Sequence, residues 1–330
     1  MAEQINTPEF HDSAKLHVTG RATYVDDIAV PSSCLHILLG LSNIAYGEIA
    51  KMALHDVKNS PGIVDVISAK DIPGKNDSSP IFGDDPIFAE NEVLYNGQVI
   101  FAVIAESIES AKAAIKKAKI EYLEKPPIIT LEQAKLEKTL LCAPKTMSQG
   151  DFTTSIKHST HIVEGEISIG GQEHFYLEPQ ASFVTPQDDG LLVVTSSQHP
   201  GEVQSAVARV LGWHMHKVTV ECRRMGGGFG GKETQAAPLA CLAALFATRR
   251  NKAVKYRMPR HDDMVQTGKR HDFATKVKLG CDAQGLLVGG DFEVAGKCGY
   301  SSCLYHVSRL GRHSVEAYRL SRSAQCTAMS

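Results

Sequence analysis

The strongest chemical signal in the sequence is a glycine-rich segment, Met225-Gly-Gly-Gly-Phe-Gly-Gly-Lys-Glu-Thr234. Five of the six residues from 226 to 231 are glycine, and glycine permits positive φ angles and a close approach of the backbone to a ligand. An apolar stretch that we predict to be a helix follows, and the N-terminal end of a helix carries a partial positive charge. We therefore interpret the segment as a cradle for an anion or an oxo group, since a plain strand-to-helix turn needs only one or two glycines.

Two nucleotide-binding motifs fit this segment incompletely. The glycines have the spacing of a dinucleotide fingerprint, but no acidic residue follows about twenty residues later, where Arg249-Arg-Asn-Lys252 stands. A P-loop needs Ser or Thr after its lysine, whereas Glu233 follows Lys232 here, and a carboxylate at that place repels phosphate oxygens. The carboxylate favours recognition of a neutral, hydrogen-bonding substrate, and a nucleotide-binding P-loop protein is the weaker hypothesis.

A second polar cluster is Gly170-Gly-Gln-Glu-His-Phe-Tyr-Leu-Glu178. It places an amide, two carboxylates and an imidazole within seven residues: Gln172, Glu173, Glu178 and His174. Taken alone, such a pattern is more often the polar end of a strand than a binding site. His214 and His216 have no third metal ligand nearby, so we interpret them as surface histidines.

Apolar periodicity predicts the elements that must position these clusters. In the N-terminal part we expect strands over 35–41, 62–67 and 99–105, a helix over 107–118 and a returning strand over 120–123. The last three elements would form a β-α-β unit. After a linker we expect a half-buried strand over 161–169, strands over 191–195 and 218–220, and helices over 201–211 and 234–249. The helix over 234–249 is apolar nearly all round, which is typical of the middle of a larger body.

Composition limits the class of protein. The 330 residues are 43% apolar and 22% charged, which suggests about two domains, each with its own core. The 35 basic and 37 acidic residues balance, which argues against a nucleic-acid or polybasic membrane partner. No apolar run approaches a membrane span and no signal peptide is visible, so we expect a cytoplasmic protein. The eight cysteines contain no Cys-x-x-Cys, which excludes the common iron–sulfur and structural zinc spacings from this chain.

Together, the two polar clusters resemble the molybdenum-cofactor subunit of the xanthine dehydrogenase and aldehyde oxidase family. Three further segments fit the same family in order along the chain: 14–27, 257–264 and 268–273. The resemblance implies an α+β fold with an α/β hammerhead domain at 11–124 and a linker at 125–150. The first part of a molybdenum-cofactor-binding domain would then occupy 151–302.

The resemblance also implies a function. The family uses a molybdenum–molybdopterin cofactor, and a xanthine dehydrogenase-type member oxidises hypoxanthine and xanthine to urate. By position, Gln172 matches the glutamine that hydrogen-bonds the oxo ligand of the metal. Phe229 and Gly230 match the loop residues whose backbone lies against that ligand, so Gln172 and Phe229 would border the molybdenum–oxo group. Glu233 matches the carboxylate that binds and orients the purine. FAD and 2Fe-2S centres are expected on partner chains.

The resemblance ends after Ser302. Residues 303–330 contain four arginines and five serines but one acidic residue, a bias that out-of-frame translation often produces. We hypothesise a frameshift near codon 303, with a diverged tail as the alternative. The family's catalytic glutamate base would then be missing, the helix over 234–249 would lack part of its cover, and the fragment would be inactive alone. The alternative functions are a non-catalytic binding or assembly module that retains partner contacts, and an aldehyde oxidase-type subunit.

Overall fold

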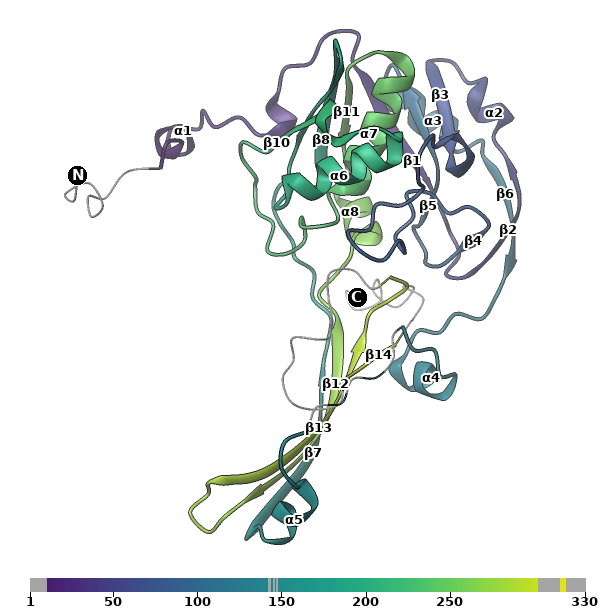
Figure 1. The fold of residues 1–330 in the computed structure, drawn as a ribbon. Coiled ribbons are helices and arrows are strands. Elements are labelled where there is room, and N and C mark those ends of the chain that lie inside the picture. The colour runs from purple at the N-terminus through teal and green to yellow at the C-terminus, as the bar shows by residue number, and fades with distance from the viewer. Residues whose placement is uncertain (1–10, 142–143, 145, 147, 302–314, 319–330) are drawn as a thin grey trace, which may run out of the picture.

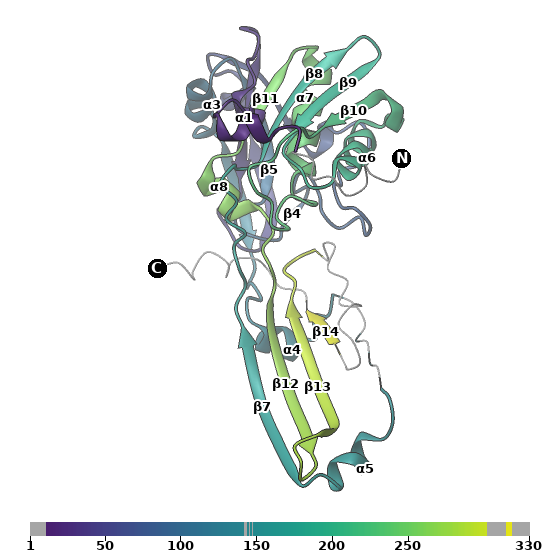
Figure 2. The ribbon, with the colours of Figure 1, turned by 90° about the vertical axis from the view of Figure 1, so that its left-hand side faces the viewer.

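The structure, a computed structural model, describes residues 11–141, 144, 146, 148–301 and 315–318. The described chain forms a broad body of sheet and helices, from which a long ribbon of strands extends (Figure 1). Turning the molecule by 90° shows that the ribbon leaves the body at one end only (Figure 2). The mixture of helices and strands is the α+β content that we predicted.

A seven-stranded mixed sheet is the centre of the body. Its order is β10 (Val218–Glu221), β9 (Gly190–Thr195), β8 (Ala181–Gln187), β11 (Val254–Arg257), β1 (Leu35–Leu41), β5 (Val99–Ala105) and β3 (Ile63–Ser68). The five strands expected over 35–41, 62–67, 99–105, 191–195 and 218–220 are thereby confirmed.

Strands from both parts of the chain share this sheet. β1 pairs in parallel with β11, with Leu35 opposite Val254. One buried cluster combines Ile37 and Ile104 with Val184 and Leu242. This shared cluster departs from the expectation of a separate core for each domain, because the sheet continues across the linker. A second buried cluster, which includes Val57 and Ala111, does lie wholly within the N-terminal part; the domain boundaries themselves stay predictions.

The expected β-α-β unit was wrong in its pairing. α3 (Ile108–Ile115) and β6 (Lys119–Glu124) follow β5 as expected, but β6 pairs antiparallel with β2 (Gly47–Ala53). β2 and β6 form a separate three-stranded sheet with β4 (Glu92–Val93). Periodicity identifies a strand but not its partner, which depends on the tertiary fold.

α7 (Ala237–Arg250) is the apolar helix that we expected over 234–249. It packs against α6 (Pro200–Leu211) and against β8, β9 and β11. Its residues 239–247 are all buried by the described chain itself. The expectation that its cover would be incomplete was therefore wrong. Among the described helices, none is long and apolar enough to cross a membrane.

The ribbon is a four-stranded sheet in the order β14 (Val315–Tyr318), β13 (Leu287–Lys297), β12 (Asp272–Cys281) and β7 (His161–Ile169). The prediction of a half-buried strand over 161–169 was wrong in burial, since every residue of β7 is exposed. The ribbon projects from the body, so this edge strand meets solvent (Figure 2). The β12–β13 hairpin was missed, although its turn at Asp282–Gly285 carries typical turn residues.

Short helices complete the described chain. α1 (Ala14–Val18) and α2 (His55–Lys58) lie in the N-terminal part, and α8 (Arg260–Gln266) follows β11. α4 (Leu131–Leu136) lies within the expected linker, and α5 (Phe152–Lys157) packs on the ribbon. The Thr130 hydroxyl caps α4 by accepting a hydrogen bond from the Gln133 amide.

Candidate cofactor site

The fold brings the two polar clusters of the sequence side by side. A Cβ atom added to Gly231 would lie 2.7 Å from a ring carbon of Tyr176 and 2.8 Å from a ring carbon of His174. A Cβ atom added to Gly226 would lie 2.5 Å from Cβ of Glu178. Only glycine allows this close approach. Segment 170–178 and loop 226–233 therefore form one unit.

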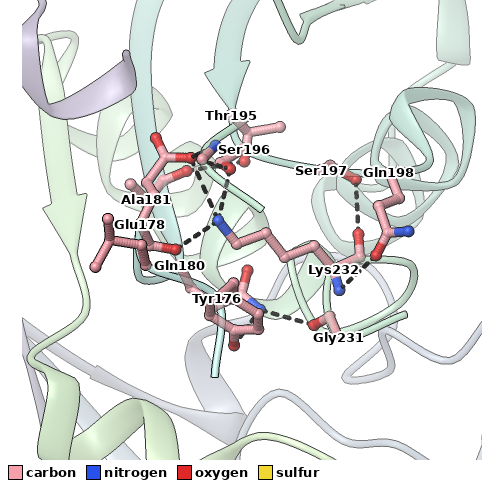
Figure 3. Close-up of polar contacts among 12 residues, drawn as sticks. Tyr176, Glu178, Gln180, Ala181, Thr195, Ser196, Ser197, Gln198, Gly231 and Lys232 are labelled. Carbon is pink, nitrogen blue, oxygen red and sulfur yellow. Dashed lines mark hydrogen bonds and ion pairs between the residues drawn. The ribbon is translucent and has the colours of Figure 1, made fainter. Parts of the chain in front are cut away.

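The inner side of this unit is built around Lys232, whose side chain is fully buried. Its Nζ donates to the carbonyl oxygen of Glu178 at 2.7 Å and to the Ser196 hydroxyl at 2.8 Å, as Figure 3 shows. The ammonium also lies 3.3 Å from Oε2 of Glu178. Burial lowers the pKa of Lys232, and the Glu178 carboxylate opposes that shift. A lysine held inward in this way cannot reach a phosphate on the loop, so the structure does not support the P-loop hypothesis.

Glu178 ties the start of the loop to the same network. Its Oε2 accepts hydrogen bonds from the Gly226 amide at 2.7 Å and from the Ser196 hydroxyl at 2.7 Å. A buried carboxylate needs such donors because it has left water. Glu178, one of the polar groups of the cluster in the sequence, thus makes structural contacts inside the protein.

Two buried residues that the sequence analysis did not single out hold Tyr176. Its hydroxyl donates to Oδ1 of Asp263 at 2.5 Å and accepts from Nε2 of Gln180 at 3.0 Å. Burial and the Asp263 carboxylate raise the pKa of Tyr176 well above its ordinary value. Nε2 of Gln180 also donates to the carbonyl oxygen of Gly231 at 3.0 Å. Asp263 lies in segment 257–264, one of the segments that carry the family resemblance. Its place in that segment was the only indication in the sequence that it belongs to the site.

The third segment of the resemblance contacts segment 170–178 through an ion pair and through hydrogen bonds of Arg270, whose Nη2 donates to the carbonyl oxygen of Gly170 at 2.9 Å. Nζ of Lys269 lies 2.7 Å from Oε2 of Glu173, and both side chains are nearly buried. The backbone of Gln172 pairs with that of Arg270 through two N–H···O bonds of 3.1 Å. The segment from 268 onward therefore holds the beginning of segment 170–178 in place.

The outer side of the unit carries the four residues that we predicted for the cofactor and the substrate. Gln172, Phe229, Gly230 and Glu233 are all exposed. The Phe229 side chain is 75% exposed, and φ is +53° at Phe229 and +90° at Gly230. No hydrogen bond joins the Gln172 side chain to the loop in the part of the chain that the structure describes.

His174 lies between the inner and the outer side. Its burial lowers the pKa of the imidazole, while the nearby carboxylates of Glu173 and Glu233 oppose the shift. Its Nε2 atom is 3.8 Å from the position of a Cβ atom on Gly230. His174 therefore lies near both Glu233 and the turn of the glycine loop.

The loop amides decide whether an oxo or anionic group fits here. The amides of Gly226, Gly230, Gly231 and Lys232 donate to acceptors within the protein. Among the described residues, no acceptor is found for the amides at 227, 228 and 229. The backbone has positive φ at Gly227, Phe229 and Gly230, and successive N–H groups in turns of this kind suit negative charge. The residues present thus fit the oxygen-rich face of a molybdenum cofactor, and the individual residue roles stay predictions.

A metal ion bound directly by the protein would need a cluster of side-chain ligands. Over residues 11–141, 144, 146, 148–301 and 315–318, no group of three or more His, Cys, Asp or Glu is placed to hold one. The residues around the loop contribute an amide, backbone N–H groups and one exposed carboxylate instead.

Comparison with known proteins gives two family matches. Residues 19–126 match the aldehyde oxidase and xanthine dehydrogenase a/b hammerhead domain. Residues 134–326 match the molybdopterin cofactor-binding domain. The second match reaches into 303–330, for which we hypothesise a frameshift; that hypothesis stays a prediction, and most of this segment lies outside the described residues.

Curated relatives agree with the family matches. Xanthine dehydrogenase 2 of Arabidopsis thaliana is 37% identical over 325 residues, which cover 96% of this chain and 24% of the relative. Aldehyde oxidase 2 of Rattus norvegicus is 37% identical over 296 residues, which cover 89% of this chain and 22% of the relative. The chain thus spans about a quarter of the length of these relatives.

Solved structures share the fold at lower identity. Aldehyde oxidoreductase from Desulfovibrio gigas superimposes with a TM-score of 0.86 at 22% identity, covering 94% of this chain and 38% of that one. Quinoline 2-oxidoreductase from Pseudomonas putida 86 gives a TM-score of 0.83 at 21% identity, covering 95% of this chain and 44% of that one. By its sequence matches and its fold, the chain belongs to the aldehyde oxidase and xanthine dehydrogenase family of molybdenum hydroxylases.

Proposed function

We propose that this chain supplies one wall of the molybdenum-cofactor site in a xanthine dehydrogenase-type enzyme that oxidises hypoxanthine and xanthine to urate. The observation that carries the proposal is Glu233, an exposed carboxylate directly after a loop that presents three amides without a described acceptor. When bound, the cofactor supplies the oxidising centre for a C–H carbon. The residues of this chain bind and orient: the loop amides and Gln172 donate toward oxygen atoms, and Glu233 accepts.

Glu233 favours a purine because its carboxylate is available as an acceptor. Its sequence neighbour Lys232 points inward to Glu178, and Lys269 is paired with Glu173. Among the described residues, no cation lies within ion-pair distance of Glu233. Burial lowers the pKa of His174, which disfavours a positive charge on its ring. A purine offers ring N–H donors to such a carboxylate, and the resulting hydrogen bonds are charge-assisted.

An aldehyde oxidase-type subunit is the second candidate, because aldehyde oxidase 2 of the rat is 37% identical, as is xanthine dehydrogenase 2 of Arabidopsis thaliana. An aldehyde carbonyl offers no N–H donor, so an unpaired carboxylate gains nothing from it. The two candidates therefore differ in what Glu233 contributes to binding.

Further chain is needed to enclose the site, because Gln172, Phe229, Gly230 and Glu233 all face solvent. Water that reaches the cofactor-facing groups weakens each of their hydrogen bonds. We propose that the remaining walls, and the FAD and 2Fe-2S centres that accept the electrons, lie outside this chain. The chain alone is then inactive.

Ligand-observed saturation-transfer NMR on the full chain tests the substrate class. Hypoxanthine should give a signal and benzaldehyde should not. Glu233→Gln should weaken the apparent affinity for hypoxanthine about tenfold, since it removes a charged acceptor. Glu221→Gln, at an exposed glutamate that ends β10, is the matched control and should leave binding unchanged. Equal signals from both ligands, or no effect of Glu233→Gln, contradict the purine assignment.

Metal analysis tests the claim of inactivity. The chain, expressed in a host that makes molybdopterin, should carry less than one molybdenum per chain and should not reduce a dye with xanthine. One molybdenum per chain together with xanthine-dependent dye reduction would refute the claim.

A further inference from the structure

The side chain of Gln198 reaches the glycine loop from a different part of the fold. It lies between the end of β9 at Thr195 and the start of α6 at Pro200. Its Oε1 accepts hydrogen bonds from the Gly230 amide at 3.0 Å and from the Lys232 amide at 3.1 Å, the second of which is drawn in Figure 3. Its own backbone N–H donates to the carbonyl oxygen of Lys232 at 2.9 Å. Three hydrogen bonds therefore fasten both sides of Gly231.

The same side chain lies in contact with the loop at Gly228. A Cβ atom on Gly228 would come within 2.6 Å of Oε1 of Gln198 and 2.7 Å of its Cδ. The side chain of Gln198 thus runs beneath the loop from Gly228 to the two amides that it accepts. A larger residue at 228 would push the glutamine away, because backbone and side chain already touch.

Support of this kind is needed because the loop is conformationally unfavourable where it faces outward. Phe229 has φ +53°, which a residue with a Cβ atom adopts only at a cost. The Phe229 side chain is 75% exposed, so its packing gives the turn little compensation. Hydrogen bonds on both sides of Phe229 must offset this strain. Gln198 accepts those on the C-terminal side, from the amides of Gly230 and Lys232.

We infer that Gln198 is a positioning residue, which fixes the direction in which Phe229 and Gly230 present their backbone. That this backbone faces a molybdenum cofactor rests on the proposed function; the positioning itself does not. Because Gln198 accepts the hydrogen bond of the Gly230 amide, that amide is not available to an oxo group. Contact with an oxo group is then left to the amides at 227, 228 and 229. The role needs an acceptor oxygen that takes two N–H groups, which a carbonyl provides.

Amide hydrogen exchange on the full chain tests this inference. Gln198→Met keeps the length of the side chain and removes the acceptor, so the Gly230 and Lys232 amides should exchange at least about tenfold faster. Gln198→Glu keeps an acceptor oxygen and should restore slow exchange. Gln204→Met is the matched control: it removes side-chain bonds to the carbonyl oxygens of Met215 and Val218 and should leave the loop amides unchanged.

Three results would overturn the inference: unchanged exchange in Gln198→Met, equal acceleration in Gln204→Met, or no rescue by Gln198→Glu. If Gln198→Met does not fold, Gln198→Asn replaces it: its side chain is one methylene shorter, so its amide oxygen no longer reaches the loop amides, and the same exchange rates are compared. The measurement needs no cofactor, so failure of the proposed function in the ligand experiment and failure of this inference are separate outcomes.

Discussion

The inner and outer sides of the site belong to the same two chain segments, yet they differ in almost every physical respect. Inside, Lys232 is fully buried and its ammonium contacts Glu178 and Ser196. Outside, one turn of the loop away, Phe229 is 75% exposed. Stability and ligand contact are therefore divided between neighbouring residues: the buried network holds the backbone, and the exposed groups are available to bind.

The largest effect should come from Lys232→Met. It leaves the nearly buried carboxylate of Glu178 without its cation, so the free energy of unfolding should fall by about 3–5 kcal/mol. Urea unfolding measures the loss. Lys217→Met removes an ion pair of similar length, 3.0 Å, with the exposed Asp189, and should cost about 1 kcal/mol or less. Equal losses would show that burial does not distinguish the two lysines.

The second-largest effect should come from a glycine of the inner side, compared with an exposed glycine of the outer side. Gly231→Ala places a methyl group within 2.8 Å of the rings of Tyr176 and His174, so it should destabilise the fold by about 1–3 kcal/mol. Gly170→Ala, in the exposed part of segment 170–178, meets open space and should change stability by less than about 0.5 kcal/mol. Thermal unfolding of both variants checks the difference; similar melting temperatures would contradict it.

A smaller effect should appear as a pH dependence. Burial lowers the pKa of His174 below its ordinary value of 6.5. As the pH falls through 6.5, the unfolded chain therefore binds a proton before the folded chain does, and stability decreases until the folded pKa is passed. His174→Gln should lose less stability than the natural chain between pH 7.5 and pH 5, as followed by urea unfolding at each pH. Parallel curves for the two proteins would contradict this cause.

The smallest effect should come from Phe229→Ala. Because the side chain is 75% exposed, the free energy of unfolding should change by less than about 0.5 kcal/mol. Chemical denaturation of the variant beside the natural chain measures it. A loss above about 1 kcal/mol would place Phe229 with the inner network and remove the contrast.

Much of the outer side could be predicted from the sequence. Phe229, Gly230 and Glu233 are neighbours in one loop, so their proximity required no knowledge of the fold. Likewise, α7 was identified as a core helix because it has no polar face, and its residues 239–247 are indeed buried. Local sequence is sufficient where the relevant residues are close together in the chain.

The inner side could not be predicted in this way. Lys232 has the sequence context of an exposed phosphate-binding lysine, and its inward position depends on Glu178 and Ser196, which come from other segments. Gln198 gave no signal because its partners are backbone amides. The same reason explains the errors at β6 and β7: their alternating side chains identify strands, whereas pairing and burial depend on distant parts of the chain.

The parallel pairing of β1 with β11 has a consequence for how the protein is made. Leu35 of β1 pairs with Val254 of β11. During synthesis, β1 therefore emerges from the ribosome long before β11 has been made. Such distant pairings slow folding, and an open strand edge is meanwhile a template for wrong association. A piece of the chain that ends before residue 254 should therefore aggregate, and the nascent protein should depend on chaperones until the central strand arrives.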